Sequence, residues 1–596
     1  MSVLDRIERL RNVMEQQKID CYIIPTDDYH HSEYVGDYFK FREYITGFTG
    51  SAGTAVFTKD KAGLWTDGRY FIQAEAQLKG SGITLYKSGE SDVPTIEEFL
   101  KSELKEGDVL GFDGRTVTYA QGKRYCHIAD ENGASLKYSL DFAQNIWKER
   151  PEMSMEPVFS LEDEYTGEKI GSKLEQIREI MKENGCNAHV LSSLDDIAWL
   201  LNIRGNDIAY CPLVLSYAIV YNNSVELFAD IRKFSDDIIN LLAENQVKIY
   251  PYEDIYRKVS EMTSEDKLLL DSSIMNYSLY QSISKETVIV DKQNPEILMK
   301  SVKNETQAEN LRKAHLKDAV AHTKFMYWLK KNIGRVEITE LSASARLEGL
   351  RAEQEHFLGP SFGPISAYGE HGAIVHYSAD EKSNVPLKEG KLFMTDTGGH
   401  YLEGSTDITR TVALGEVGNI EKEHFTLVAR AMLRLANTVF LYGCSGANLD
   451  CIAREVFWKE GLNFNHGTGH GVGYLLNIHE GPINFRWKEG ERPAPALEEN
   501  MVITDEPGIY IEGSHGIRLE NELLVRKTVK NEYGQFMNFE ILTYVPIDLD
   551  AILPEKMSTE EKEMLNHYHK QVYEKVSPYL SEEERIWLKE YTRAVK

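Results

Sequence analysis

The sequence is poor in cysteine, in positive charge and in long apolar runs, and each shortage excludes a class of protein. Six of 596 residues are cysteine, and none forms a C-x-x-C pair, which excludes a disulfide scaffold. No stretch approaches the roughly 18 apolar residues of a membrane span. Lys and Arg number 67 against 94 Asp and Glu, giving a net charge of −27. We therefore expect no binding to nucleic acid or to an anionic membrane.

The first residues, MSVLDRIERL, begin a charged amphipathic helix. They lack the apolar core and the small-residue cleavage site of a signal peptide. Because the few cysteines also fit reduced thiols in a cytosol, we expect a cytoplasmic protein.

The length predicts several domains rather than one core. We expect a first domain over 1–154, a second over 155–302 and a third over 303–596, whose end, from about 552, is a helical extension. In the first, a helix at Val3–Gln17 leads to a strand at Cys21–Ile24. The second repeats this plan with a helix at Gly171–Asn184 and a strand at Ala188–Leu191.

Two further motifs recur in the first two domains at a nearly constant offset. The pairs are Asp27-Asp28 with Asp195-Asp196, and Asp67-Gly-Arg69 with Asp230-Ile-Arg232. A period this long indicates a duplicated domain and not a solenoid. Within each copy, the Asp and Arg two residues apart either pair with each other or bind a partner subunit.

Helical periodicity follows residue 307, and His315 and His322 lie on the same face as apolar side chains. We interpret these histidines as packed or capping groups.

In the tail, Ser558 with Glu561 and Ser581 with Glu584 form two capping boxes, so each pair begins a helix.

Two apolar strands carry a carboxylate each. Leu392–Asp396 ends on an acid before a glycine turn, and Asp407 lies in a β-branched run, Thr406-Asp-Ile-Thr-Arg-Thr-Val. A hairpin-like connection places both carboxylates on one sheet face, close enough to share a metal. Taken alone, two aspartates at strand ends are common.

The run His466-Gly-Thr-Gly-His470-Gly-Val-Gly473 has glycine at alternate positions between two imidazoles. Such a segment buries little and loses much entropy on folding, so core packing does not explain it. Its backbone should approach another group closely, and one of its histidines can hold substrate while another is a ligand.

Two more strands bring acids. Val502–Asp505 runs into Glu506-Pro-Gly, and a strand from Ile517 should carry Glu520 and Glu522 on one face, in parity with Arg518. Several buried carboxylates repel one another unless cations neutralise them. Oxygen ligands with a single imidazole suit Mn²⁺, Co²⁺, Fe²⁺ or Zn²⁺ better than a structural zinc site.

With these motifs, the sequence resembles aminopeptidase P, the Xaa-Pro aminopeptidases, in their long three-domain cytosolic form. The wider pita-bread family includes prolidase, methionine aminopeptidase and creatinase. The matching segments are the five ligands in their settings, His466–Gly473, Asn477–Pro482, Glu506–Tyr510, Ala373–Tyr377, Asp196–Gly205 and Leu565–His569.

The resemblance implies a role for each matching residue. The metal ligands would be Asp396, Asp407, His470, Glu506 and Glu520, with Asp407 and Glu520 bridging two ions. A hydroxide would lie between the ions, and Glu506 would take its proton. The other catalytic residues would be His376, His466 and His479. These three histidines would line the substrate pocket, and Arg518 and Tyr510 would lie near the proline of the substrate.

The resemblance also implies the fold, the cofactor and the partners. The fold class is α/β (α+β), with two similar α/β N-terminal domains followed by a C-terminal pita-bread catalytic domain. The cofactors are two divalent metal ions, with Mn²⁺ expected and Co²⁺ or Zn²⁺ as alternatives. The substrates are peptides with proline second, and the chain would form a homodimer. An Xaa-Pro bond has no N–H and a constrained φ, so it requires a dedicated pocket.

Two other functions stay open. A prolidase has the same ligands but cleaves dipeptides, and usually has one N-terminal domain where this chain repeats two. A non-catalytic pita-bread peptide-binding module loses ligands, as do creatinase-type enzymes, whereas all five are present here. His371 departs from the asparagine of many relatives, which predicts altered substrate contacts nearby.

Overall fold

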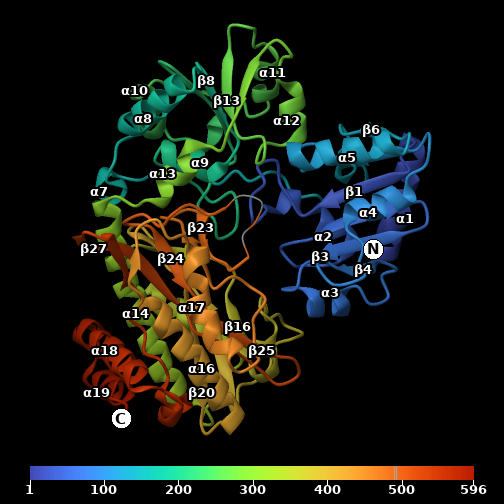
Figure 1. Ribbon diagram of the computed structural model, residues 1–596. Helices are drawn as coiled ribbons and strands as arrows, with labels where there is room; N and C mark the ends of the chain where they lie inside the picture. Colours follow the sequence, from blue (N-terminus) through green and yellow to red (C-terminus); the bar gives the residue numbers. More distant parts are fainter. Residues whose placement is uncertain (489, 491–492) are drawn as a thin grey trace. The chain divides into compact units, whose positions relative to one another are not determined.

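The computed structural model describes residues 1–488, 490 and 493–596 (Figure 1). The chain forms two compact units. The first contains Met1–Leu161 and Glu168–Glu296, and the second contains Glu162–Gly167 and Ile297–Lys596. Among the described residues, no helix has both the length and the apolar character needed to cross a membrane. The domain boundaries at 154 and 302 stay a prediction.

The first unit contains two six-stranded sheets. In spatial order, the first sheet has β4 (Thr84–Lys87), β3 (Ala62–Thr66), β2 (Thr54–Thr58), β1 (Cys21–Pro25), β5 (Val109–Phe112) and β6 (Ser135–Lys137). The second sheet has β12 (Val247–Tyr250), β11 (Val225–Phe228), β10 (Tyr217–Tyr221), β8 (Ala188–Leu191), β13 (Lys267–Leu270) and β14 (Val288–Asp291). The main helices around them are α1 (Val3–Gln17), α4 (Ile96–Glu103), α5 (Tyr119–Glu131), α8 (Ile170–Glu183), α10 (Asp236–Glu244) and α11 (Asp254–Ser260).

These two sheets have the same topology, which confirms the two similar α/β domains expected from the sequence. β1 pairs antiparallel with β2 and parallel with β5, and β8 pairs in the same way with β10 and β13. The repeated Asp and Arg pairs contact each other. Arg69 donates to Asp67 at 2.8 Å, and Arg232 donates to Asp230 at 2.9 Å from Nε.

The second unit contains several short β-sheets. A three-stranded sheet has the order β16 (Ile365–Tyr368), β17 (Lys391–Thr397) and β20 (Ile408–Leu414). A six-stranded sheet has the order β21 (Phe440–Leu441), β28 (Gly534–Ile541), β27 (Asn521–Asn531), β24 (Val502–Asp505), β22 (Gly469–Val472) and β23 (His479–Phe485). Another three-stranded sheet has the order β15 (Phe357–Pro360), β18 (Gly399–Tyr401) and β19 (Gly404–Ser405). A two-stranded sheet pairs β25 (Gly508–Ile511) with β26 (His515–Arg518).

Helices pack against these sheets in the second unit. They are α14 (Glu305–Asn332), α15 (Glu340–Ala352), α16 (Asn419–Ala436), α17 (Gly446–Trp458), α18 (Thr559–Val576) and α19 (Glu582–Tyr591). Both capping boxes expected in the tail are present, at Ser558 and Ser581, and they begin α18 and α19. The two tail helices lie beside α14 (Figure 1). The extension is therefore part of the folded unit.

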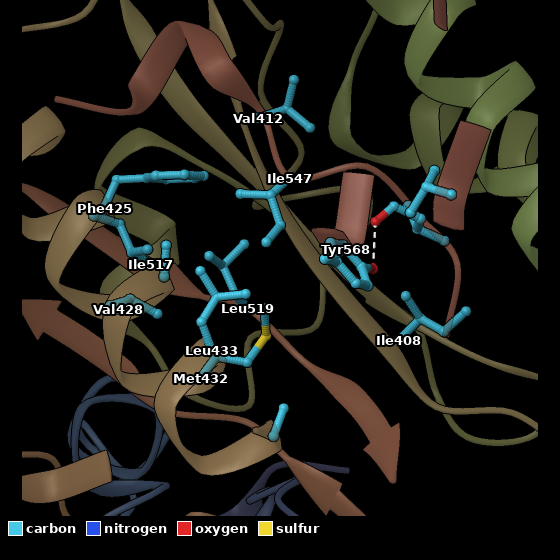
Figure 2. Close-up of a cluster of buried hydrophobic side chains, with 14 of the residues drawn as sticks. Ile408, Val412, Phe425, Val428, Met432, Leu433, Ile517, Leu519, Ile547 and Tyr568 are labelled. Carbon is cyan, nitrogen blue, oxygen red and sulfur yellow. Dashed lines mark hydrogen bonds between the residues drawn. The ribbon is translucent and has the colours of Figure 1, made fainter. Parts of the chain in front are cut away.

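One apolar core joins α16, the sheet strands and α18 (Figure 2). The core includes Phe425, Val428, Met432 and Leu433 of α16 together with Ile408, Val412, Ile517, Leu519 and Ile547. Tyr568 of α18 lies at its edge, and its hydroxyl donates to Val545 O at 2.7 Å. Arg410, a fully buried guanidinium, donates to the same hydroxyl at 2.7 Å and also to Glu520 O. Arg410 thus connects the tail helix to the segment that carries Glu520.

Tyr568→Phe is expected to destabilise the second unit by about 1–3 kcal/mol, because it leaves a buried donor of Arg410 and a buried carbonyl without this partner. The denaturation midpoint of the full chain, measured beside that of Tyr579→Phe, checks this. Tyr579 is 57% exposed, so its hydroxyl is replaceable by water. Equal midpoints for the two variants would contradict the prediction.

Candidate metal centre

The five side chains that the sequence predicts as metal ligands lie on, or directly beside, strands of the second unit. Asp396 lies near the end of β17, Asp407 directly before β20, His470 on β22, Glu506 directly after β24, and Glu520 between β26 and β27. Antiparallel pairing places Asp396 opposite Thr409. Glu520 N donates to Thr409 O at 3.1 Å, and Glu506 N donates to Thr468 O at 2.8 Å. Backbone hydrogen bonds therefore hold these segments side by side.

The candidate ligand atoms form three overlapping groups, and within each group they lie within 4.8 Å of one another. The groups are Asp407 with His470 and His479, His470 with Glu506 and Glu520, and Asp396 with Asp407 and Glu520. The structure thus brings all five expected residues into one cluster. It also brings His479 there, which the family resemblance assigned to substrate.

Glycines allow the strands to approach. A Cβ at Gly469 would lie 1.9 Å from Thr504 O, and one at Gly471 would lie 2.2 Å from Glu480 O. Any side chain there would separate β22 from β24 and β23. The alternate glycines of the His466–Gly473 run therefore serve close strand packing around His470, as the sequence led us to expect.

The ring of His470 is oriented toward the carboxylates. Its Nδ1 lies 2.9 Å from Gly471 O, so this nitrogen carries the hydrogen and Nε2 faces the acids. Nε2 lies 3.5 Å from an oxygen of Asp407 and 3.7 Å from one of Glu506. Burial alone would lower the pKa of His470, but the hydrogen bond to Asp407 and the charges of Glu506 and Asp407 raise it to about 9. A lone pair facing two carboxylates requires a cation between them, either a proton or a metal ion.

The buried acids have strongly altered pKa values. Burial raises the pKa of Glu506 to about 7 and raises that of Glu520 well above its ordinary value. Burial also raises the pKa of Asp396 in spite of Arg518. The pKa of Asp407 is lowered, because contact with His470 outweighs the effect of burial. Burial, and after it the mutual repulsion of these carboxylates, disfavours their charged forms, and a divalent cation in the cluster would relieve both effects.

The cluster fits a pair of hard or borderline divalent ions. Four carboxylates and an imidazole whose Nε2 points inward are the donor types that Mn²⁺, Co²⁺ and Zn²⁺ accept. Among the described residues, Asp396 Oδ1 is buried without a hydrogen-bond partner, as expected of an oxygen kept for a metal. Asp396, Asp407 and Glu520 are each at most 8% exposed.

A chain of polar contacts runs from Asp396 to His466. Arg518 forms an ion pair with Asp396 Oδ2 through Nη2, and its Nη1 donates to the Tyr510 hydroxyl at 2.7 Å. The Tyr510 hydroxyl donates to His466 Nε2 at 2.8 Å, since Nδ1 of that ring faces Gly467 O. Burial, then the charge of Arg518, lowers the pKa of His466 to about 3. His466 is therefore a neutral acceptor. Arg518 and Tyr510 border the cluster, and their place beside the proline of a substrate stays a prediction.

His376 lies on a turn after the 3-10 helix η3 (Gly369–Ala373) and is half-buried. The preceding carbonyl, Val375 O, accepts a hydrogen bond from Arg518 Nη2 at 3.3 Å. The charge of His376 contributes to the lowered pKa of His466. His376 thus lies on the Arg518 side of the cluster.

A buried pair behind Asp407 was not identified from the sequence. Glu522 Oε1 accepts from Asp407 N at 2.7 Å, and its Oε2 lies 3.0 Å from His315 Nε2. The sequence pattern indicates a packed or capping group at His315, whereas the structure places its imidazole in this buried polar pair. The signal available was a histidine on an apolar helix face together with an acid two residues from a proposed ligand.

One strand prediction was wrong. The chain does not run as one strand through Arg518, Glu520 and Glu522, because β26 ends at Arg518 and β27 begins at Asn521. The interruption turns Glu520 into the metal cluster, while Glu522 faces Asp407 N and His315. Simple alternation across a continuous strand does not describe this segment.

Comparison with known families divides the chain into four matches. Residues 6–137 and 149–307 match creatinase/prolidase N-terminal domains, 309–527 match metallopeptidase family M24, and 535–595 match the C-terminal region of that peptidase family. The matches cover both N-terminal sheets, the metal cluster and the tail helices.

Relatives of similar length support the same grouping. The chain is 34% identical to aminopeptidase P1 of Arabidopsis thaliana over 99% of each chain. It is 36% identical to Xaa-Pro aminopeptidase 1 of Dictyostelium discoideum over 97% of this chain and 94% of that one.

Comparison with solved structures supports the same family and fold. The X-prolyl aminopeptidase of Caenorhabditis elegans, described as a cytosolic enzyme with a di-nuclear active site, superposes over 100% of both chains with a TM-score of 0.95 at 33% identity. An Xaa-Pro dipeptidase from Bacillus anthracis shares the fold over 64% of this chain, with a TM-score of 0.51 at 24% identity.

Proposed function

Because the chain belongs to the Xaa-Pro aminopeptidases of metallopeptidase family M24, we propose that it hydrolyses the bond between an N-terminal residue and a following proline. This membership confirms the resemblance and the fold class inferred from the sequence. The observation that carries the activity is the cluster of four carboxylates and His470, complete in one connected site. A non-catalytic binding module would not need this set.

We propose that Asp396, Asp407, His470, Glu506 and Glu520 hold two divalent metal ions, with Mn²⁺ as the expected metal and Co²⁺ or Zn²⁺ as alternatives. When bound, the ions supply Lewis acidity and lower the pKa of water at the cluster. The di-nuclear site described for the Caenorhabditis elegans enzyme supports the number of ions.

In this proposal, the protein residues move protons and hold the substrate. Glu506 accepts the proton of the attacking water, a role that its carboxylate can take from its place in the cluster with His470 and Glu520. His479 lies in the same cluster and contacts the substrate carbonyl. His376 contacts the substrate from its turn, and His466, kept neutral, offers an acceptor within the polar chain.

Arg518 and Tyr510 are proposed to border the proline side of the substrate. Their mutual hydrogen bond at 2.7 Å fixes both groups before substrate arrives. A proline nitrogen carries no hydrogen, so the pocket needs no acceptor for a substrate N–H at that position. Shape and the free amine of the substrate then determine selectivity.

We also propose that the chain acts in the cytoplasm as a homodimer. The cytosolic description of the Caenorhabditis elegans enzyme supports the location. Sedimentation equilibrium on the full chain tests the assembly, and a single species with the mass of one chain would contradict it.

Arg-Pro-Pro is expected to lose only its first residue, while Arg-Ala-Pro and N-acetylated Arg-Pro-Pro stay intact. The reason is that the proposed site needs both a proline after the scissile bond and a free amine. Chromatography of the products from the metal-loaded enzyme measures this. Faster cleavage of the dipeptide Arg-Pro than of the tripeptide would favour a dipeptidase, and no cleavage of any peptide would favour a binding module.

A further inference from the structure

Glu340, the first residue of α15, is a fully buried carboxylate outside the metal cluster. Burying a carboxylate is unfavourable unless its oxygens receive hydrogen bonds. Both oxygens do, and all the donors belong to one segment, 368–385. Oε1 accepts from Tyr368 N at 2.8 Å and His371 Nδ1 at 2.8 Å, and Oε2 accepts from Tyr377 OH at 2.9 Å and Val385 N at 3.3 Å.

This segment carries His376 between two of the donors. Tyr377, the next residue, is held by its hydroxyl on Glu340 and by its ring, which packs with Ile365, Ala367 and Met394. The ring of His371 also stacks on that of Tyr377, with centroids 4.5 Å apart. His371 is therefore part of the hydrogen-bonded support of this segment.

The segment also packs directly on β26. Gly372 and Gly516 touch through their backbones, since a Cβ on Gly516 would lie 1.6 Å from Gly372 O. Val375 O accepts from Arg518 Nη2 at 3.3 Å. Contacts with β26 and with Glu340 together thus define where His376 lies.

We propose that Glu340 is a positioning residue that places His376 for substrate binding through its four hydrogen bonds to segment 368–385. The inference rests on the proposed function in one respect, namely that His376 contacts substrate. It adds that this contact depends on Glu340, a residue of α15 that lies far in sequence from the residues of the metal cluster. Glu340 itself touches neither substrate nor metal.

Glu340→Gln is the direct test, because the amide keeps the side-chain length but turns an N–H₂ group toward two of the four donors. For the metal-loaded full chain with Arg-Pro-Pro, kcat/KM is expected to fall about ten- to a hundred-fold, with a raised KM. Metal content by mass spectrometry should equal that of the wild type. Glu348→Gln, at an exposed position on the same helix, is the matched control and should behave as the wild type.

A double-mutant cycle with His376→Ala separates positioning from general destabilisation. When His376 is absent, Glu340→Gln should reduce kcat/KM by less than about two-fold, because the group that it positions is gone. The same loss in both backgrounds, or no loss in the wild-type background, overturns the proposal. A wild type that does not cleave Arg-Pro-Pro refutes the proposed function instead.

If Glu340→Gln yields no folded protein, Tyr377→Phe provides the same test. It removes one hydrogen bond from Glu340 and keeps the ring in its apolar contacts. A smaller loss of kcat/KM that vanishes in the His376→Ala background supports the proposal. An undiminished loss in that background overturns it.

Discussion

Replacing Glu506 by glutamine is expected to lower kcat of the metal-loaded enzyme by about 10²- to 10⁴-fold, the range of a lost general base. Glutamine has nearly the same shape but cannot accept a proton near neutral pH. The carboxylate of Glu506 lies with His470 and Glu520 in one candidate ligand group, so its replacement should also weaken metal binding. Single-turnover cleavage of Arg-Pro-Pro measures the effect.

The control for this change is Glu512→Gln, since Glu512 is exposed on the turn between β25 and β26. Both variants should retain the circular dichroism of the wild type in the presence of metal, and Glu512→Gln should also retain its thermal midpoint, whereas weaker metal binding lowers the midpoint of Glu506→Gln. Activity of Glu506→Gln close to that of Glu512→Gln would remove Glu506 from the mechanism.

Removal of metal with a chelator is expected to abolish activity and to make the stability of the protein depend strongly on pH. At a metal concentration about 1,000 times Kd, binding adds about 4 kcal/mol of stability. We expect about two ions per chain in the active protein, counted by mass spectrometry. The gain in thermal midpoint on adding Mn²⁺ should be small at pH 5 and large at pH 8.

The metal-free protein should lose stability as pH rises, because two groups have raised pKa values in the folded chain. Glu506 has a pKa of about 7 against 4.5 ordinarily, so the metal-free fold loses stability as pH rises from about 4.5 to about 7. His470 has a pKa of about 9 against 6.5. Its contribution is fully present below 6.5 and is lost as pH rises through about 9. Both losses run in the same direction between pH 5 and pH 8.

Metal replaces the protons at these groups, so it restores stability where the protons have left. Differential scanning fluorimetry of the chelated and the Mn²⁺-loaded protein at both pH values measures the difference. Asp396→Asn with the same additions is the comparison, and its Mn²⁺-induced shift should be reduced. A midpoint of the metal-free protein that rises from pH 5 to pH 8 would contradict the assignment of these groups.

Local patterns in the sequence predicted the elements that carry the site. Apolar strands that stop on an acid were identified at Asp396 and Glu506, and β17 and β24 contain those runs. The alternate glycines around His470 predicted close backbone packing, and Gly469 and Gly471 do pack on neighbouring strands. These predictions succeeded because period, glycine placement and capping act within a few residues of the chain.

The partners of buried polar groups were not predictable in this way. His315 and Glu522 are more than 200 residues apart. The sequence around one of them does not indicate the other as its partner, yet the two side chains form one pair behind Asp407. Glu340 is likewise an ordinary acid at a helix start until the fold brings four donors to it. Identifying such contacts requires the register of strands and the packing of helices.

The sequence by itself determined the class of chemistry, since four carboxylates and an imidazole in these local settings are compatible with burial only beside cations. Only the tertiary structure decided which oxygens share one cluster, that β26 and β27 separate at Glu520, and that His479 joins the ligand group. The physical reason is distance. Propensity and alternation are set by neighbours along the chain, whereas charge coupling acts over a few ångströms between strands that only the complete fold brings together.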